Sequence, residues 1–97
     1  MKEVEEVQRG YRIRGTVQGV FYRAWTQETA GELGLTGTVR NRNDGSVEAH
    51  VRGPEGAMRT FEDRLWHGPA GASVETVERI ESDASLPEGA FQVLPTV

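Results

Sequence analysis

The stretch GTVQGVFYR, residues 15–23, combines residue types that suit the binding of a small anion. It contains no proline and no acidic residue, so every residue keeps a backbone N–H donor and no carboxylate repels an anion. Gly15 and Gly19 give the backbone the freedom to turn several donors toward one point. Arg23 adds a permanently charged, planar group that can pair with two oxygens at once. Placed before a predicted helix, this pattern indicates a cradle for a phosphate-sized oxyanion.

The same stretch also indicates which kinds of phosphate chemistry are not expected. It lacks the Lys-Ser/Thr ending of a Walker loop, so a nucleotide bound with Mg²⁺ is not predicted. The chain contains no cysteine, which excludes a thiol phosphoenzyme and any disulfide. A glycine-containing turn followed by a solvated arginine has the same residue pattern, so the stretch alone leaves this structural interpretation open.

The residues on either side of the loop predict a strand before it and a helix after it. Residues 7–13 place apolar side chains at alternate positions, as in a half-buried strand, and the strand becomes fully buried only after Arg9. Residues 23–33 contain no proline and carry a thin apolar stripe at helical spacing, with Gly34 as the expected stop. The anion cradle is therefore expected at a strand-to-helix junction.

The second half of the chain repeats the same kinds of element. Two strand-like runs flank residues 43–45, Asn-Asp-Gly, which is a sequence typical of hairpin turns. Residues 58–65 carry large apolar side chains at i, i+3 and i+7, which predicts an amphipathic helix that ends at Gly68-Pro69. The order predicts an α+β fold, the ferredoxin-like α/β sandwich (βαββαβ), with two helices on one face of an antiparallel sheet.

The last elements are less regular. Residues 73–82 favour a strand, but Val77 and Ile80 differ in parity, which either a bulge or a late start of the strand would explain. Phe91 and Val93 suggest a short extra strand after the loop around Pro87.

Length and composition limit the classes of protein to consider. At 97 residues the chain is expected to form one domain over residues 1–97, with residues 1–6 frayed. The net charge of −4 argues against a general nucleic-acid binder, whose affinity depends on a basic face. The sequence shows neither a signal peptide nor an apolar stretch long enough for a membrane span, so we expect a soluble cytoplasmic protein. His50 and His67 stand in different elements without acidic partners at ligand spacing, so no metal site is predicted.

Two stretches of the sequence resemble the acylphosphatase family. GTVQGVFYR is similar to the family signature, in which Gly-x-Val-Gln-Gly-Val is followed after two residues by Arg. The second stretch is LGLTGTVRNRNDGSVE, residues 33–48, with Asn41 at the position of the family's asparagine. The similarity continues through GP at 53 and 54, Phe61, and GPAGASV at 68–74, so it covers nearly the whole chain.

This resemblance implies an enzyme that hydrolyses acyl phosphates to a carboxylate and inorganic phosphate, with no metal, cofactor or covalent intermediate. It implies Arg23 and Asn41 as catalytic residues, with Arg23 on the phosphoryl group and Asn41 orienting the attacking water. The substrate-binding residues that it implies are Gly15, Thr16, Val17, Gln18, Gly19, Val20, Phe21, Tyr22 and Arg23. The same fold is expected from the resemblance as from the order of strands and helices.

The expected partners follow from that activity. They are a small-molecule acyl phosphate and inorganic phosphate, the latter as product and inhibitor, while no nucleic acid or membrane is expected and a monomer is predicted. The alternative is a non-catalytic anion-binding or regulatory module on the same fold, and a nucleic-acid-binding module is a third possibility. Having both Arg23 and Asn41 favours the enzyme, because binding alone does not require the asparagine. No group of side chains in the sequence indicates which acyl group is recognised.

Overall fold

A computed structural model describes residues 5–97 of the chain. Its elements, in chain order, are β1 (Glu6–Thr16), α1 (Tyr22–Glu32), β2 (Thr36–Asn41), β3 (Val47–Pro54), α2 (Glu55–His67), β4 (Ser73–Ile80) and β5 (Phe91–Val93). The predicted order of elements is confirmed, including the short last strand. Among the described residues, no helix combines the length and the apolar character needed to span a membrane.

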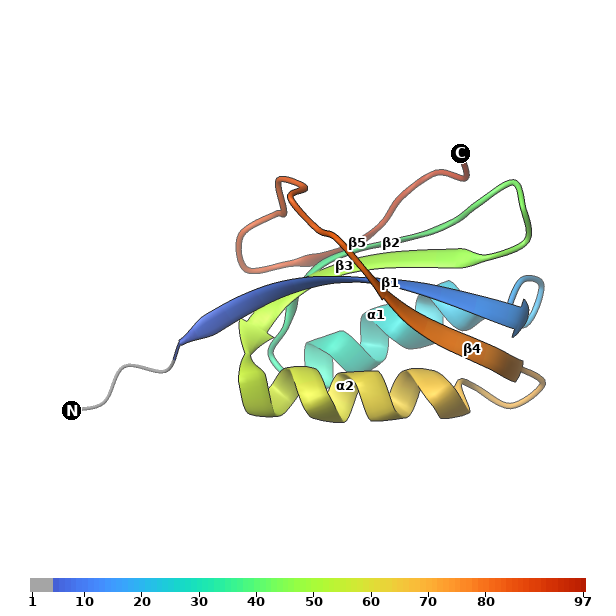
Figure 1. Cartoon of the computed structure of the whole chain (residues 1–97), viewed down its shortest axis with the longest axis horizontal. Coiled ribbons are helices and arrows are strands. Elements are labelled where there is room, and N and C mark those ends of the chain that lie inside the picture. Colours follow the sequence, from blue (N-terminus) through green and yellow to red (C-terminus); the bar gives the residue numbers. More distant parts are fainter. Residues whose placement is uncertain (1–4) are drawn as a thin grey trace.

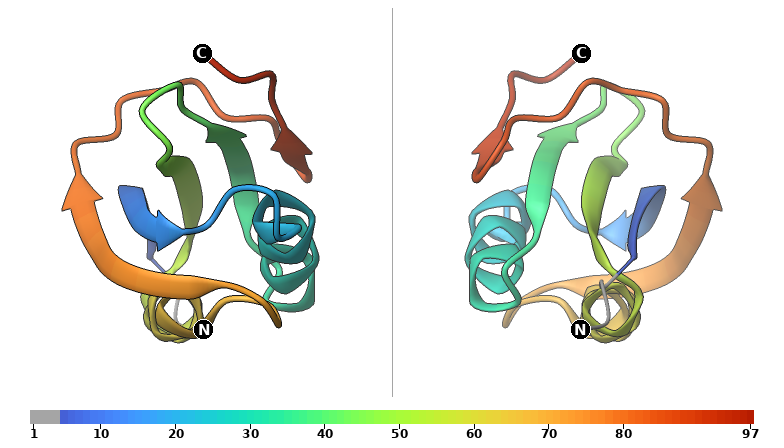
Figure 2. Two further views of the ribbon diagram at one scale, coloured as in Figure 1. Left: turned by 90° about the vertical axis from the view of Figure 1, so that its right-hand side faces the viewer. Right: turned by 90° about the vertical axis from the view of Figure 1, so that its left-hand side faces the viewer.

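The strands form one sheet in the order β4-β1-β3-β2-β5, and both helices lie against one face of it (Figures 1 and 2). The first four strands pair antiparallel, as predicted. The last strand, β5, differs because it pairs parallel to β2 at the sheet edge. The sheet is therefore mixed, and β5 lies beside the strand that carries Asn41.

β5 pairs parallel to β2 because of the path of residues 81–90, which cross from one edge of the sheet to the other. Hydrogen bonds hold this segment over the helix-free face: Gln8 Nε2 donates to Ser82 Oγ (3.0 Å) and to the Ala84 carbonyl (2.9 Å). His50 Nδ1 lies 2.6 Å from Ser82 Oγ. A crossover of this kind returns the chain in the direction of β2, so β5 adds as a parallel strand. His50 thus has a structural contact here.

The hydrophobic core fills the space between the sheet and the two helices. From α2, the side chains of Met58, Phe61 and Leu65 are fully buried, as their spacing predicts. Phe61 packs between Tyr11 and Phe91, at ring-centroid distances of 6.0 Å and 6.4 Å. Burying a phenylalanine contributes roughly 1.5–3 kcal/mol. Phe91 is therefore an apolar anchor for β5, which has only three residues.

The β2–β3 hairpin turns at the predicted residues. Asp44 Oδ1 accepts hydrogen bonds from the Ser46 backbone N–H (2.9 Å) and hydroxyl (2.6 Å), and these bonds lower the pKa of Asp44 to about 2. Gly45 has φ = 93°, a conformation that favours glycine. These contacts fix the turn that joins β2 to β3, and Asn41 is the last residue of β2 before this turn.

A bulge explains part of the irregular pattern in β4. The register between β1 and β4 shifts between Arg14 and Gly15, which adds a residue on the β4 side. Val74 therefore shares a face with Val77, and both pack against the core. Ile80 lies on the opposite face of the sheet. The bulge therefore accounts for Val74 and Val77 sharing a face, and it does not place Ile80 there.

The expected fraying of residues 1–6 is only partly open to comparison, because residues 1–4 lie outside the described part of the chain. The expectation is wrong at Glu6, which begins β1 and pairs with Pro54. The reason is that β3 continues to Pro54 and so offers a partner to the first residue of β1.

Gly15 allows β1 and β4 to approach closely just before the loop. Its φ is +127°, and a Cβ atom added there would lie 2.2 Å from the Ser73 carbonyl oxygen. We expect Gly15→Ala to destabilise the fold by more than about 1 kcal/mol, which lowers Tm by more than about 4 °C. Thermal unfolding followed by circular dichroism measures this shift.

Gly31→Ala is the matched control for this glycine substitution. Gly31 lies inside α1, and nothing lies within 4 Å of the position that its Cβ would take. Alanine is the better helix former by about 1 kcal/mol, so this variant should have a raised Tm. A Gly15→Ala protein as stable as the parent would contradict the close approach of the two strands.

Candidate active site

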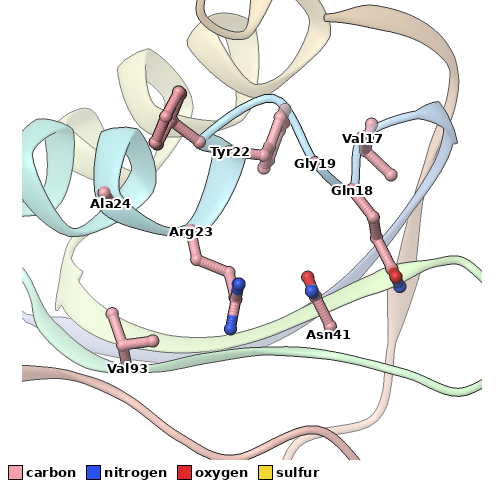
Figure 3. A pocket seen from close by; sticks show the side chains of 9 residues that line it. Val17, Gln18, Gly19, Tyr22, Arg23, Ala24, Asn41 and Val93 are labelled. Atoms are coloured by element: carbon pink, nitrogen blue, oxygen red, sulfur yellow. The ribbon is translucent and has the colours of Figure 1, made fainter.

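The loop of residues 17–21 connects β1 to α1 and forms one wall of a pocket (Figure 3). Val17 is buried in the core, and Val20 is partly buried and packs against it. Gln18 Nε2 donates hydrogen bonds to the carbonyls of Arg42 (2.8 Å) and Ser46 (2.9 Å). The two valines thus hold the loop to the core, and the Gln18 amide holds it to the β2–β3 hairpin.

The backbone N–H groups of this loop are available to a ligand. Within the described chain, no N–H of residues 18–23 donates a hydrogen bond to another residue. Helix α1 begins at Tyr22 with no side-chain cap, and its first turn contains no acidic residue. Unpaired N–H groups and the helix dipole together give this end of α1 a positive potential. The arrangement favours an anion.

Arg23 supplies the positive charge of the site. It lies in the first turn of α1, is half-buried, and extends its guanidinium toward the space between α1 and β2 (Figure 3). Within residues 5–97, no carboxylate lies within ion-pair distance of this guanidinium. A half-buried cation without a counter-ion attracts a doubly charged oxyanion strongly, because water screens it only in part.

Asn41 faces the same space from the opposite wall. It is the last residue of β2 and its side chain lies near Arg23 and Gln18 in the close-up view (Figure 3). Its Oδ1 atom is buried and accepts no hydrogen bond from the described residues. An unpartnered buried acceptor costs about 1–3 kcal/mol, which a bound water or ligand hydroxyl would offset. The site therefore contains a neutral acceptor suited to a water molecule.

The pocket that these groups share has a volume of about 460 Å³. Its lining is formed by Val17, Gln18, Gly19, Phe21, Tyr22, Arg23, Ala24, Asn41 and Val93. The structure thus brings Arg23 and Asn41 together with most of the residues of the predicted loop. Nothing in the lining is negatively charged.

Three residues of the predicted loop lie elsewhere. Gly15 and Thr16 belong to β1, where they pair with Val74 and Ser73 of β4, and neither lines the pocket. Val20 is directed to the core and also stays out of the lining. The reason is that the strand continues as far as Thr16, so the loop itself is shorter than the sequence motif.

Two residues line the pocket without having been predicted from the sequence. Ala24 follows Arg23 in the first turn of α1, and its position could have been found from the helix start. Val93 comes from β5, beside Val39 of β2. Its place depends on the parallel pairing of β5, for which the sequence carries no local signal.

Tyr22 lines the pocket, but its side chain has a structural role. Its ring is buried against Trp25, at a centroid distance of 5.3 Å, and its hydroxyl donates to the Leu65 carbonyl at 2.6 Å. Burial raises the pKa of Tyr22 far above its ordinary value. A phenol that is held in this way anchors α1 on α2 and supplies no proton near neutral pH.

The described residues contain no group of three or more His, Asp or Glu side chains placed to bind a metal ion. Within the pocket lining itself, the donor groups are amides, a phenol and a guanidinium. Of these groups, the Arg23 guanidinium can donate to an oxyanion without losing an ion pair with a described residue, whereas catalytic metals in proteins prefer carboxylates and imidazoles.

Comparisons with known proteins found similar sequences and similar structures. The profile of the family described as Acylphosphatase matches residues 9–93. An acylphosphatase of Rhizobium meliloti (strain 1021) is 48% identical over 82 residues, which cover 84% of this chain and 86% of that protein. One from Azoarcus sp. (strain BH72) is 52% identical over 86 residues, covering 88% and 86% of the two chains. The solved structure of an acylphosphatase from Coxiella burnetii superimposes with a TM-score of 0.86, at 32% identity, over 97% of this chain and 100% of that chain. The chain therefore belongs to the acylphosphatase family, whose enzymes hydrolyse acyl phosphates.

Proposed function

We propose that the described pocket hydrolyses acyl phosphates to a carboxylate and inorganic phosphate. The backbone N–H groups of residues 18–23 and the guanidinium of Arg23 hold the phosphoryl oxygens, and Asn41 holds the attacking water. One observation carries this proposal: a guanidinium, an amide oxygen and a set of loop N–H groups lie at the same pocket, and none of them has a partner among residues 5–97.

In the proposed reaction, the water oxygen attacks phosphorus in line with the bond to the acyl oxygen. That P–O bond breaks and its electron pair leaves with the carboxylate. The transition state for phosphoryl transfer is loose, so its main needs are positioning and stabilisation of charge on the phosphoryl oxygens. The N–H groups and Arg23 meet the second need, and Asn41 meets the first.

Proton transfer places few demands on the protein in this reaction. A carboxylate is a weak base and departs without a general acid, so the lack of an acidic group in the pocket lining is acceptable. The phosphate itself takes the proton released by the water. A neutral amide at Asn41 is suited to hold this water, because a carboxylate at that position would repel the phosphoryl oxygens.

The groups that the proposed reaction uses, namely the loop N–H groups, Arg23 and Asn41, all belong to one copy of the chain. We therefore propose that the monomer is the active unit. The product, inorganic phosphate, fits the same cradle and should act as a competitive inhibitor.

Steady-state hydrolysis of benzoyl phosphate in excess EDTA tests the proposed function. We expect full activity under these conditions, because the lining offers neither carboxylate nor imidazole to a metal. Hydrolysis of p-nitrophenyl phosphate, a monoester with a more basic leaving group, should be slower by at least about 10²-fold. Activity that is lost in EDTA and restored by Mg²⁺ or Zn²⁺ would contradict the proposed mechanism. Phosphate binding without any turnover would instead indicate an anion-binding module.

A further inference from the structure

We infer that Phe21 and Val93 form a subsite for the acyl half of the substrate, and that this subsite selects uncharged apolar groups, aromatic ones above all. The inference rests on the proposed function, because it takes the phosphoryl group to lie at Arg23. It adds what the sequence did not indicate, namely which chemical class of acyl group the pocket accepts.

Phe21 is the first residue that carries the inference. Its side chain is 83% exposed although it belongs to the lining of the pocket. Its backbone has φ = 62°, and within residues 5–97 no other residue except glycine has a positive φ. A large side chain in this left-handed conformation is strained, and glycine or asparagine would relieve the strain. In the free protein the exposed ring gains no burial in return, so a contact with substrate accounts for both features.

Val93 adds a second apolar surface to the same pocket. It is 41% exposed and lies on the β5 side, across the pocket from α1 (Figure 3). Ala24, which also lines the pocket, is small and exposed, so it leaves room for a bound group. These three side chains belong to two distant segments, and each presents carbon atoms to the ligand.

The polar side chains of the lining either have partners in the described structure or are used by the proposed reaction, in which Asn41 holds the water. Gln18 Nε2 donates to two backbone carbonyls, and the Tyr22 hydroxyl donates to the Leu65 carbonyl. Arg23 is the one charged residue among the pocket-lining residues, and the proposed reaction uses it for the phosphoryl group. A second anionic group on the acyl half would therefore meet apolar side chains and no cation. Uncharged acyl groups fit this surface, and a flat aromatic ring gains the most from packing on Phe21.

Binding of two phosphonates tests the subsite without any need for turnover. Phenylphosphonate and methylphosphonate share the anionic group and differ only in the part that would meet Phe21. By isothermal titration calorimetry, we expect the parent to bind phenylphosphonate roughly two- to tenfold more tightly. In Phe21→Asn, which tolerates the left-handed backbone, and in Val93→Ser, this ratio should fall toward one. Any change in the cradle cancels in the ratio.

Trp66→Ala serves as the matched control. Trp66 is an exposed aromatic residue of α2 that does not line the pocket, so its removal should leave the ratio at the parental value. The ratio of kcat/KM for benzoyl phosphate over acetyl phosphate should change in the same way as the binding ratio.

The possible failures of the inference and of the proposed function have different signatures. A parent that binds both phosphonates equally, or a Phe21→Asn variant with the parental ratio, overturns the subsite and leaves the proposed hydrolysis intact. A parent that binds neither phosphonate nor inorganic phosphate overturns the anion site, and the subsite with it.

Discussion

Replacing Arg23 with alanine should lower kcat/KM for benzoyl phosphate by at least about 10²-fold, the effect of removing one preorganised charge-stabilising donor from an active site. The guanidinium is half-buried and has no ion-pair partner within residues 5–97, so it is available to a bound phosphoryl group. Each charge-assisted hydrogen bond that it makes contributes roughly 1.5–3 kcal/mol. Inhibition by inorganic phosphate should weaken in parallel, because the same charge binds substrate and product.

Arg23→Lys tests whether the geometry of this side chain matters as well as its charge. A lysine offers a point charge and cannot pair with two oxygens in one plane, so it should recover only a small part of the activity. Arg59→Ala is the control, since Arg59 is an exposed arginine of α2 outside the pocket and its loss should leave kcat/KM unchanged. If phosphate inhibits Arg23→Ala as well as it inhibits the parent, the anion binds elsewhere.

For Asn41→Ala we expect a different pattern: kcat lower by about 10²-fold and inhibition by phosphate nearly unchanged. The reason is that the proposed amide–water contact matters mainly in the transition state, when the water must be aligned with the breaking bond. The substitution should not lower Tm. Oδ1 accepts no hydrogen bond in the described structure, so its removal breaks no hydrogen bond to a described residue and no longer leaves a buried acceptor unpaired.

Two further variants separate water positioning from a structural role at the hairpin. Asn41→Asp keeps the shape of the side chain but adds a negative charge, so it should weaken phosphate inhibition as well as kcat. Asn43→Ala changes an exposed asparagine in the turn of the same hairpin, and it should leave kcat at the parental value. If Asn41 only braces the hairpin, Asn41→Ala will lose thermal stability, and activity will fall only as far as the protein unfolds. A stable Asn41→Ala protein with normal kcat would refute the water-positioning role.

Local patterns in the sequence were sufficient to predict most of the fold. The 43–45 turn was predictable because its causes are local. Asp44 accepts a hydrogen bond from Ser46, two residues further along, and Gly45 adopts a positive φ. The second helix was predictable because three large apolar residues recur at helical spacing and all become buried. Such features depend on neighbours in the chain, so the order of residues carries the information directly.

Most residues that line the candidate site were also indicated by the sequence, but their arrangement was not. The uncharged loop with Arg23 at its end marks an anion cradle through its own composition. That Asn41 lies across from it depends on the order of strands and on Gln18, whose amide joins the loop to the hairpin at the Arg42 carbonyl. Contacts between segments this far apart follow from packing of the whole sheet.

Tertiary structure alone decided the limits of the pocket. It assigned Gly15 to β1, since the ladder with β4 extends to that residue, and it brought Val93 into the lining through the parallel pairing of β5. It also placed Phe21 in a left-handed conformation at the start of α1. No residue pattern near Phe21 or Val93 specifies these positions, because each results from the path that the rest of the chain takes. The order of residues thus indicated the groups that we propose to hold phosphate, and the packing of distant strands formed the apolar surface that we propose for the acyl group.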